Sequence, residues 1–143
     1  MDTLLWKLHL GATLLMTGVI LSVQFVQYPL FAQVGNSVAF LKYHSAHMQR
    51  ITWVVGPLMI LELVTQTLLL AKRPHDTTLW IGATLLLLAW LSTAFVQVPA
   101  HKRLQGGLDF SVHRWLVCSN WLRTVAWSAR SALLLGSLNL SYG

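Results

Sequence analysis

Charged residues are scarce in this sequence. Only 10% of its 143 residues are Asp, Glu, Lys or Arg, whereas 55% are hydrophobic, and the mean hydropathy is +0.60. A soluble domain of this length needs more charged side chains to cover its core. The composition therefore excludes an ordinary soluble protein and predicts a chain that lies in lipid.

Acidic residues and cysteines are rarer still. The single cysteine, Cys118, rules out an internal disulfide bond. Of the four acidic residues only Glu62 lies within a long apolar stretch, which excludes a carboxylate-bridged di-iron centre because that site needs several glutamates. The sequence also lacks a His-Glu-x-x-His zinc motif, a glycine-rich phosphate loop and a cysteine-pair metal site.

Long apolar stretches are what the chain has instead. Residues 8–41 and 77–101 contain no charge, residues 51–71 contain only Glu62, and residues 115–143 contain only Arg123 and Arg130. Because about 20 apolar residues cross a bilayer as a helix, we expect four spans at about 4–31, 38–71, 77–104 and 110–138. The first stretch is too long for a signal peptide and no cleavage site follows it.

The predicted fold is thus all-α: a single domain over residues 1–143, a polytopic membrane protein that forms an up-down four-transmembrane-helix bundle with both termini on the same side. The second helix is longer than a membrane is thick, so its first turns should project from the bilayer. Helix ends and bends are expected at the prolines and at capping residues, namely Pro29, Asn36 or Ser37, Pro57, Pro99 and Asp109.

The net charge of +6 would indicate nucleic acid in a soluble protein. Here the cations flank apolar spans, where phospholipid headgroups lie, so we expect membrane lipid as a partner and no nucleic acid. We call the side with both termini side A, and the side with the loops at 32–42 and 102–110 side B. Loop cations are equal in number until Arg114 is added, which favours a cytoplasmic side B. We expect an integral protein of a bacterial inner membrane.

Polar side chains within the spans follow helical spacing. Each costs about 2 kcal/mol or more in a bilayer, so they should face the bundle interior. The stripes are His9, Thr13, Thr17 and Gln24 in the first helix; His44, His47 and Glu62 in the second; Thr93, Gln97 and His101 in the third; and His113, Asn120, Arg123, Trp127 and Arg130 in the fourth.

Up-down topology brings most of these groups to one level near side B. Glu62 and Arg130 lie deeper, where an ion pair would neutralise both. The sequence therefore predicts a polar pocket in the side B half of the bundle, with the pair of Glu62 and Arg130 as its floor.

Structural interpretations stay open for each group. Glu62 and Arg130 can pair merely to fix helix register, and His44 and His47 can be interfacial residues of a projecting helix. Gln24, Gln97 and the threonines can be interhelical hydrogen-bonding residues. Among the tryptophans, Trp6, Trp80 and Trp115 are placed for interfacial anchoring, whereas Trp121 and Trp127 flank Arg123 and can hold a guanidinium or an aromatic ligand.

Two histidines three residues apart are consistent with a metal site. His44 and His47 share a helical face, and His101 or His113 can join them from neighbouring helices. Such a set suits copper, zinc, iron or haem b, all of which accept imidazole ligands. The predicted metal ligands are His44, His47 and His101.

Several short motifs resemble known small membrane proteins. They are Trp6-Lys7-Leu8-His9, the run from Met48-Gln49-Arg50 to Pro57-Leu58-Met59, Val98-Pro99-Ala100-His101-Lys102-Arg103-Leu104, and Asn120-Trp121-Leu122-Arg123-Thr124 with Trp127 and Arg130. In layout the chain resembles four-helix membrane proteins of the anthrone oxygenase-like kind and, more remotely, the four-helix protoporphyrinogen oxidase. The resemblance implies an oxidoreductase acting on flat aromatic or tetrapyrrole substrates, and implicates His9, Arg50, His101 and Arg123.

Two functions are consistent with the sequence. The first is a membrane oxidoreductase that takes an apolar or aromatic lipid-soluble molecule into the side B pocket. The second is a non-catalytic accessory subunit or lipid-binding protein, whose polar stripes only fix helix packing. A homo-oligomer or another membrane protein is a further expected partner. The candidate catalytic residues are His44, His47, Arg50, His101 and Arg123, and the candidate cofactor-binding residues are Asn120, Trp127, Gln97 and Gln24.

Arg123 carries the most specific expectation. If Glu62 serves Arg130, Arg123 has no intramembrane carboxylate to pair with. Backbone carbonyls, Gln24, Gln97 or lipid headgroups can then satisfy it. Alternatively, an anionic ligand group or a haem propionate binds its five-donor fork.

Overall fold

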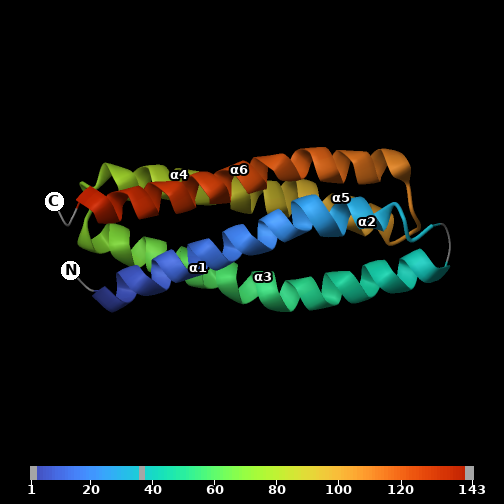
Figure 1. The fold of residues 1–143 in the computed structure, drawn as a ribbon, viewed down its shortest axis with the longest axis horizontal. Helices are drawn as coiled ribbons and strands as arrows, with labels where there is room; N and C mark the ends of the chain where they lie inside the picture. The colour runs from blue at the N-terminus through green and yellow to red at the C-terminus, as the bar shows by residue number, and fades with distance from the viewer. Residues whose placement is uncertain (1–2, 36–37, 141–143) are drawn as a thin grey trace.

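The computed structural model describes residues 3–35 and 38–140 and contains no strand within them. Four long helical segments match the four predicted spans (Figure 1). The first consists of α1 (Thr3–Ser22), η1 (Val23–Gln27) and α2 (Tyr28–Phe31), and the second is α3 (Val38–Lys72). The third consists of α4 (Thr77–Ser92), η2 (Thr93–Gln97) and α5 (Val98–Leu104), and the fourth is α6 (Phe110–Leu140).

Two aspartates cap helices in the described part of the chain, and one of these caps was predicted from the sequence. The Asp109 carboxylate accepts the backbone N–H groups of Ser111 and Val112, which confirms it as the cap of α6. The Asp76 carboxylate caps α4 by accepting the Leu79 N–H at 3.2 Å. Asn36 and Ser37, the predicted cap of the second helix, lie outside the described residues.

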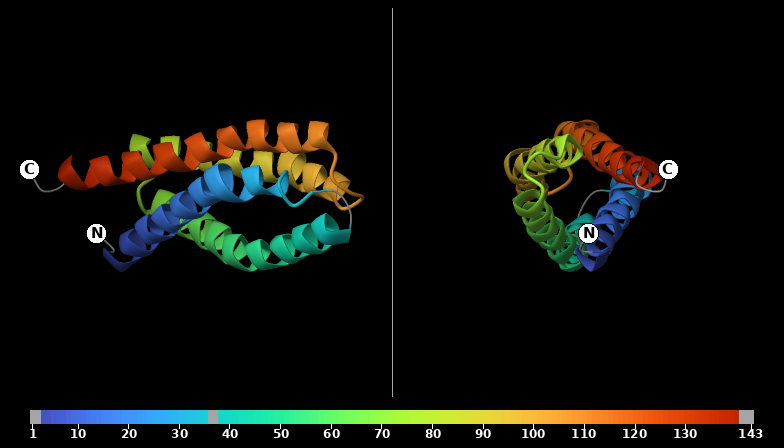
Figure 2. Two further views of the ribbon diagram at one scale, coloured as in Figure 1. Left: turned by 45° about the vertical axis from the view of Figure 1, so that its right-hand side comes forward. Right: turned by 90° about the vertical axis from the view of Figure 1, so that its left-hand side faces the viewer.

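The four segments lie side by side in an antiparallel bundle. The first turn of α1 and the last turn of α6 lie at one end, together with the α3–α4 turn, and the turns after α2 and α5 lie at the other (Figure 1). We keep the names side A end and side B end for them. Viewed along its axis, the bundle has α1 between α3 and α6, and α4 between α3 and α6 (Figure 2).

Three of the segments, residues 3–31, 38–72 and 77–104, are long and apolar enough to cross a membrane. The fourth, α6, is not among them, because it carries Arg114, Arg123 and Arg130. The outward surface of α6 is nevertheless apolar: Trp121, Leu122, Val125 and Leu135 are exposed, whereas Arg123 and Arg130 are buried. Exposed Trp53 and Phe95 extend this apolar exterior over α3 and η2, an arrangement typical of a surface that contacts lipid or protein.

Two π-helical turns, which the sequence analysis missed, interrupt the first and third segments. They are η1 and η2, and each ends in the same motif, Phe-Val-Gln-x-Pro, at residues 25–29 and 95–99. The Tyr28 N–H bonds to the Val23 carbonyl and the Val98 N–H to the Thr93 carbonyl, five residues back. Proline lacks the N–H that an α-helical bond would need, and the wider turn accommodates this loss. Both segments then continue past Pro29 and Pro99.

Helix α3 runs without a break through Pro57, as predicted, and is visibly bent in its middle (Figure 2). It packs along α1 and against α4, but at most loosely on η2 and α5. This bend leaves space between α3 and the η2–α5 part of the third segment. The candidate site lies in that space.

Candidate functional site

The predicted ion pair of Glu62 and Arg130 is confirmed. Arg130 Nη2 lies 3.3 Å from Glu62 Oε1, and both side chains are buried. Thr13 donates to Oε1 at 2.8 Å, and the Trp127 indole N–H donates to Oε2 at 2.8 Å. The carboxylate is therefore held by three partners from two other helices, Thr13 of α1 and both Trp127 and Arg130 of α6.

A second set of polar contacts extends from this pair towards the side A end. Arg130 also donates to Gln66 Oε1 at 3.2 Å and to the Gly82 carbonyl. His9 Nδ1 lies 2.8 Å from Thr65 Oγ1. His9 was implicated by the family resemblance, but here it belongs to this side A cluster and not to the side B pocket.

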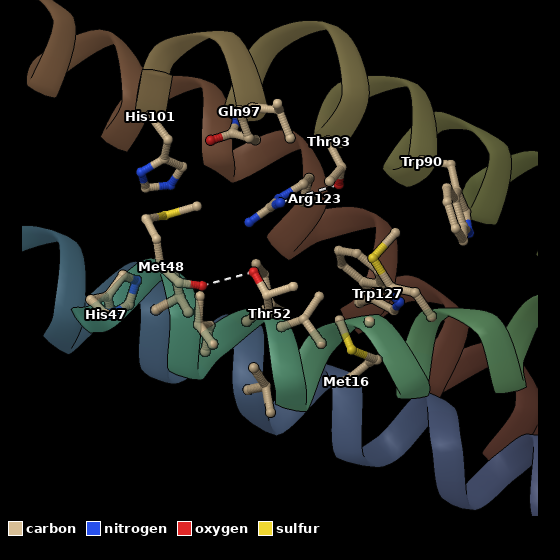
Figure 3. A pocket seen from close by; sticks show the side chains of 18 of the residues that line it. Met16, His47, Met48, Thr52, Trp90, Thr93, Gln97, His101, Arg123 and Trp127 are labelled. Atoms are coloured by element: carbon tan, nitrogen blue, oxygen red, sulfur yellow. Dashed lines mark hydrogen bonds between the residues drawn. The ribbon is translucent and has the colours of Figure 1, made fainter. Parts of the chain in front are cut away.

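A cavity of about 280 Å³ occupies the side B half, between α3 and the η2–α5 segment (Figure 3). Its walls are mostly apolar, so the prediction of a polar pocket needs correction: a few polar groups lie among apolar ones, with Gln97, His101 and Arg123 on one side and His47 and Thr52 of α3 on the other. The floor also differs, because the Trp127 ring separates the cavity from Glu62 and Arg130. Residues that line the cavity include Met16, Tyr28, Gln97, His101, Arg123 and Trp127.

The cavity opens sideways through the bundle wall. Thr52 and Ile60 of α3 and Val98 of α5 line it, and all three are exposed on the outer surface. These residues flank the loosely packed seam between α3 and α5. If the outer surface lies in lipid, the entrance faces the hydrocarbon and not an aqueous end of the bundle.

Arg123 lines this cavity without a carboxylate partner. Its Nε donates to Asn120 Oδ1 at 2.9 Å and its Nη1 to Thr93 Oγ1 at 3.1 Å. The guanidinium also interacts with the Tyr28 side chain, and its carbon lies 6.0 Å from the Trp127 ring centroid. Among residues 3–35 and 38–140 no ion pair forms at Arg123. Figure 3 shows one of its nitrogens pointing into the cavity.

A layer of amides behind Arg123 fixes its position. Asn120 Nδ2 donates to Gln24 Oε1 at 2.9 Å, and the Thr124 hydroxyl donates to the same oxygen at 3.3 Å. Gln24 Nε2 in turn donates to the Val117 carbonyl. Asn120 and Gln24 are thus positioning residues and do not line the cavity.

Three side chains form a hydrogen-bonded chain at the side B end of the cavity. The Tyr28 hydroxyl lies 3.0 Å from His101 Nε2, and His101 Nδ1 lies 3.0 Å from His44 Nε2. A neutral imidazole carries one N–H, so if His101 donates to His44, Tyr28 donates to His101. Reversing every donor gives the opposite polarity. A proton can therefore move along the chain in either direction.

His44 itself is buried among rings. It stacks on Phe40 at 5.5 Å between centroids and meets Phe31 edge-on at 5.7 Å, so it is not the water-exposed interfacial residue that the sequence left open. His113 is also accounted for, because its Nε2 donates to the Tyr28 carbonyl at 2.7 Å. It fixes the backbone that carries Tyr28.

No group of three or more His, Cys, Asp or Glu side chains in the described part of the chain is arranged to hold a metal ion. Both nitrogens of His101 already have protein partners. His47 lines the cavity, with its ring centroid 6.4 Å from that of His101. The predicted metal ligands His44, His47 and His101 therefore come close together without forming a three-residue group that could hold a metal ion.

The structure thus brings together only part of the predicted site. His47, His101, Arg123, Gln97 and Trp127 line the cavity, and His44, Asn120 and Gln24 support it from behind. Arg50, a predicted catalytic residue, is exposed and lines a separate crevice between η1 and α3.

Two tryptophan predictions also change. Trp6 is buried between α1, α3 and α6 instead of anchoring at an interface, and Trp121 packs edge-on against Phe25 on the outer surface, 5.5 Å between centroids. Tyr28 and Thr93 were not among the predicted site residues. Thr93 belongs to the polar stripe with Gln97 and His101, and Tyr28 lies one helical turn after Gln24. The helical spacing therefore placed both residues on inward faces.

Comparison with known proteins adds no relative. No family model matches the chain, and neither the curated proteins nor the solved structures that were compared give a match. The resemblance drawn from short motifs stays a prediction, and the function has to be inferred from the site.

Proposed function

We propose that this chain is an integral membrane protein with four spanning helices that binds a small, apolar, lipid-soluble molecule through an oxygen atom and moves a proton at that oxygen. The observation that carries the proposal is Arg123, a buried cation without a carboxylate partner that faces an apolar cavity. Holding such a charge within a span is costly. A ligand oxygen in the cavity completes its hydrogen bonding.

The apolar walls determine the rest of the ligand. Met16, Met59 and Trp90 line the cavity with other apolar side chains, and methionine and tryptophan adapt well to flat aromatic molecules. A volume of about 280 Å³ lies just below the usual range for ligand sites, about 300–1,000 Å³, and therefore suits a small ligand. An aromatic molecule of two or three rings is the class that suits it best.

The chain from Tyr28 through His101 to His44 supports proton transfer. Tyr28 lines the cavity next to Arg123, so a ligand oxygen bound by Arg123 lies near the Tyr28 hydroxyl. When Tyr28 gives a proton to this oxygen, it takes one from His101, and His101 takes one from His44. The relay balances when His44 receives a proton at its other ring nitrogen, Nδ1, from outside the three-residue chain. Arg123 stabilises the anionic form of the oxygen before or after transfer.

An oxidoreductase acting on such a molecule remains our proposal for the reaction class. Proton movement at a phenol, enol or quinone oxygen accompanies the oxidation or reduction of these compounds, and the site provides for the proton. The electron partner lies outside the proposal. The competing function, a non-catalytic accessory or lipid-binding protein, is favoured by polar residues outside the cavity, such as Thr17 and Gln66, whose hydrogen bonds join helices.

Binding of a matched pair of probes tests the proposal. We expect the protein in lipid nanodiscs to bind 1,4-naphthoquinone more tightly than naphthalene, after correction for partition into nanodiscs without protein. Arg123→Gln should remove this preference because the oxygen loses its cationic donor and the shorter, neutral amide does not replace it. Arg114→Gln, an exposed arginine of the same helix, is the matched control and should retain it. Equal binding of both probes by the unmodified protein would overturn the proposal.

A further inference from the structure

Gln97 has a buried oxygen without a hydrogen-bond donor. The residue ends the π-helical turn η2, is 1% exposed and lines the cavity. Its Oε1 atom has no partner in the described part of the chain. Figure 3 shows this side chain on the same wall as Arg123 and His101, with its oxygen directed to the cavity.

The orientation of the amide follows from its neighbour. The Ser119 hydroxyl donates to the Leu116 carbonyl at 3.3 Å, so its oxygen is free only to accept. In this arrangement Gln97 presents Nε2 to Ser119, at 3.1 Å, and the reversed amide would require the Ser119 hydroxyl to turn from the Leu116 carbonyl to Gln97 Oε1. The oxygen of Gln97 is therefore held towards the cavity by Ser119.

The surrounding cavity supplies no donor to this oxygen. Arg123 Nε and Nη1 donate to Asn120 and Thr93, and the Tyr28 hydroxyl lies 3.0 Å from His101 Nε2; neither the remaining N–H groups of Arg123 nor this hydroxyl bonds to Gln97 Oε1. A buried acceptor that lacks a donor is unfavourable and rare in folded proteins. A molecule in the cavity can supply the missing donor.

We propose that the ligand carries a hydroxyl group, which donates its hydrogen to Gln97 Oε1 while its oxygen accepts from Arg123. This inference rests on the proposed function and adds the chemical class of the ligand. A hydroxyl is the smallest group that donates and accepts at once. Ethers and simple ketones satisfy Arg123 but leave Gln97 unpaired, so Gln97 makes the site selective for an alcohol or a phenol.

Two probes that differ only in the O–H test this selectivity. In nanodiscs, 1-naphthol should bind about tenfold more tightly than 1-methoxynaphthalene, the effect of one hydrogen bond to a buried acceptor, after the same correction for partition into lipid. Gln97→Met should reduce the difference to about twofold or less, because methionine fills similar space and has no strong acceptor.

Gln27→Met is the matched control. Gln27 holds the same position in the other Phe-Val-Gln-x-Pro motif but lines the outer crevice and not the cavity, so its substitution should leave the preference for 1-naphthol unchanged. Ser119→Ala provides a second test should Gln97→Met fail to fold. It frees the amide to turn its N–H₂ group to the cavity, which should also weaken the preference.

Equal binding of 1-naphthol and 1-methoxynaphthalene by the unmodified protein would overturn the inference and indicate that water supplies the donor. A preference that survives Gln97→Met and Ser119→Ala would overturn it as well. The proposed function is judged separately: it holds if 1-methoxynaphthalene still binds better than naphthalene in an Arg123-dependent way, and it fails if neither oxygenated probe does.

Discussion

At the scale of single residues, the bundle treats its two buried arginines differently. Arg130 is neutralised by Glu62, whereas Arg123 has only neutral partners, Asn120 and Thr93. Both lie on one face of α6, so the difference comes from what the neighbouring helices supply. The neutralised arginine fixes the structure, and the other remains available to a ligand.

Glu62→Gln should destabilise the protein by about 3 kcal/mol, because it leaves Arg130 buried without its counter-ion. Unfolding in mixed detergent micelles measures the effect. Asp76→Asn is the control, since it removes the partly exposed pair of Arg73 and Asp76 and should cost less than about 1 kcal/mol. A similarly small decrease in the free energy of unfolding of both variants would mean that the pair of Glu62 and Arg130 contributes little to stability.

Arg123→Lys should leave the protein folded but weaken its binding of 1,4-naphthoquinone about tenfold. Lysine keeps the charge but not the planar fork that reaches Asn120, Thr93 and the ligand at once. The titration described for Arg123→Gln measures this, with Arg114→Lys as control. Full binding by Arg123→Lys would show that charge alone matters at this position.

At the scale of the elements, the π-helical turns and the bend of α3 shape the cavity. The turn η2 provides Thr93, which accepts a hydrogen bond from Arg123, and Gln97, which lines the cavity. Pro99 follows two residues after this turn. The bend at Pro57 moves α3 away from this wall. A proline accompanies each of these features. Pro29 and Pro99 each follow a π-helical turn, whereas Pro57 lies inside a continuous α-helix.

The cap of α6 should make stability depend on pH. The Ser111 hydroxyl, followed by the Val112 and Ser111 N–H groups, stabilises the Asp109 carboxylate and lowers its pKa below the ordinary 3.8. Because the folded pKa is the lower one, this stabilisation is complete above the unfolded pKa and is lost as pH falls through the folded pKa.

Unfolding measurements between about pH 5 and pH 2 check this prediction. The free energy of unfolding of the unmodified protein should fall relative to that of Asp109→Asn, which keeps the capping oxygen but does not ionise. Parallel curves for the two proteins would show that the carboxylate has no effect on stability.

At the scale of the whole molecule, the bundle is inverted relative to a soluble one. Its exposed surface carries large apolar side chains such as Trp53 and Phe95, while its interior holds Glu62, Arg123 and Arg130. In lipid this arrangement is favourable because polar groups can be satisfied only within the bundle. The sideways opening of the cavity then gives a lipid-soluble molecule a route that avoids water.

Membrane insertion with the predicted topology can be tested with two cysteines in a Cys118→Ala background. His75 lies in the α3–α4 turn and Gln105 follows α5, and both are exposed. We expect a membrane-impermeant maleimide to label a cysteine at Gln105 only from the cytoplasmic face and one at His75 only from the opposite face. Labelling of both from the same face would disprove the four-span topology, and exchanged faces would reverse the orientation.

The sequence by itself determined the four helical segments, the position of their polar side chains along the bundle axis and the faces that turn inwards. Runs of apolar residues define the four segments, and helical spacing identifies His44, Gln97, Asn120 and Arg130 as interior. These properties are local, because the charge, the hydropathy and the prolines of one segment decide where its helix lies and which of its faces is polar. Even the pair of Glu62 and Arg130 followed, because the interior spans contain a single carboxylate.

Only the tertiary structure decided which interior groups meet and which face a cavity. His44 and His47 share a helical face, yet His44 packs behind His101 while His47 lines the space. Arg50 turns outwards, although His47 and Ile51 of the same helix line the cavity. The π-helical turns shift the register of Gln97 and Thr93 by a fraction of a turn, and the rotation of each helix against its neighbours sets the distances between side chains. Such distances depend on contacts between segments far apart in the chain, which no spacing within one helix can specify.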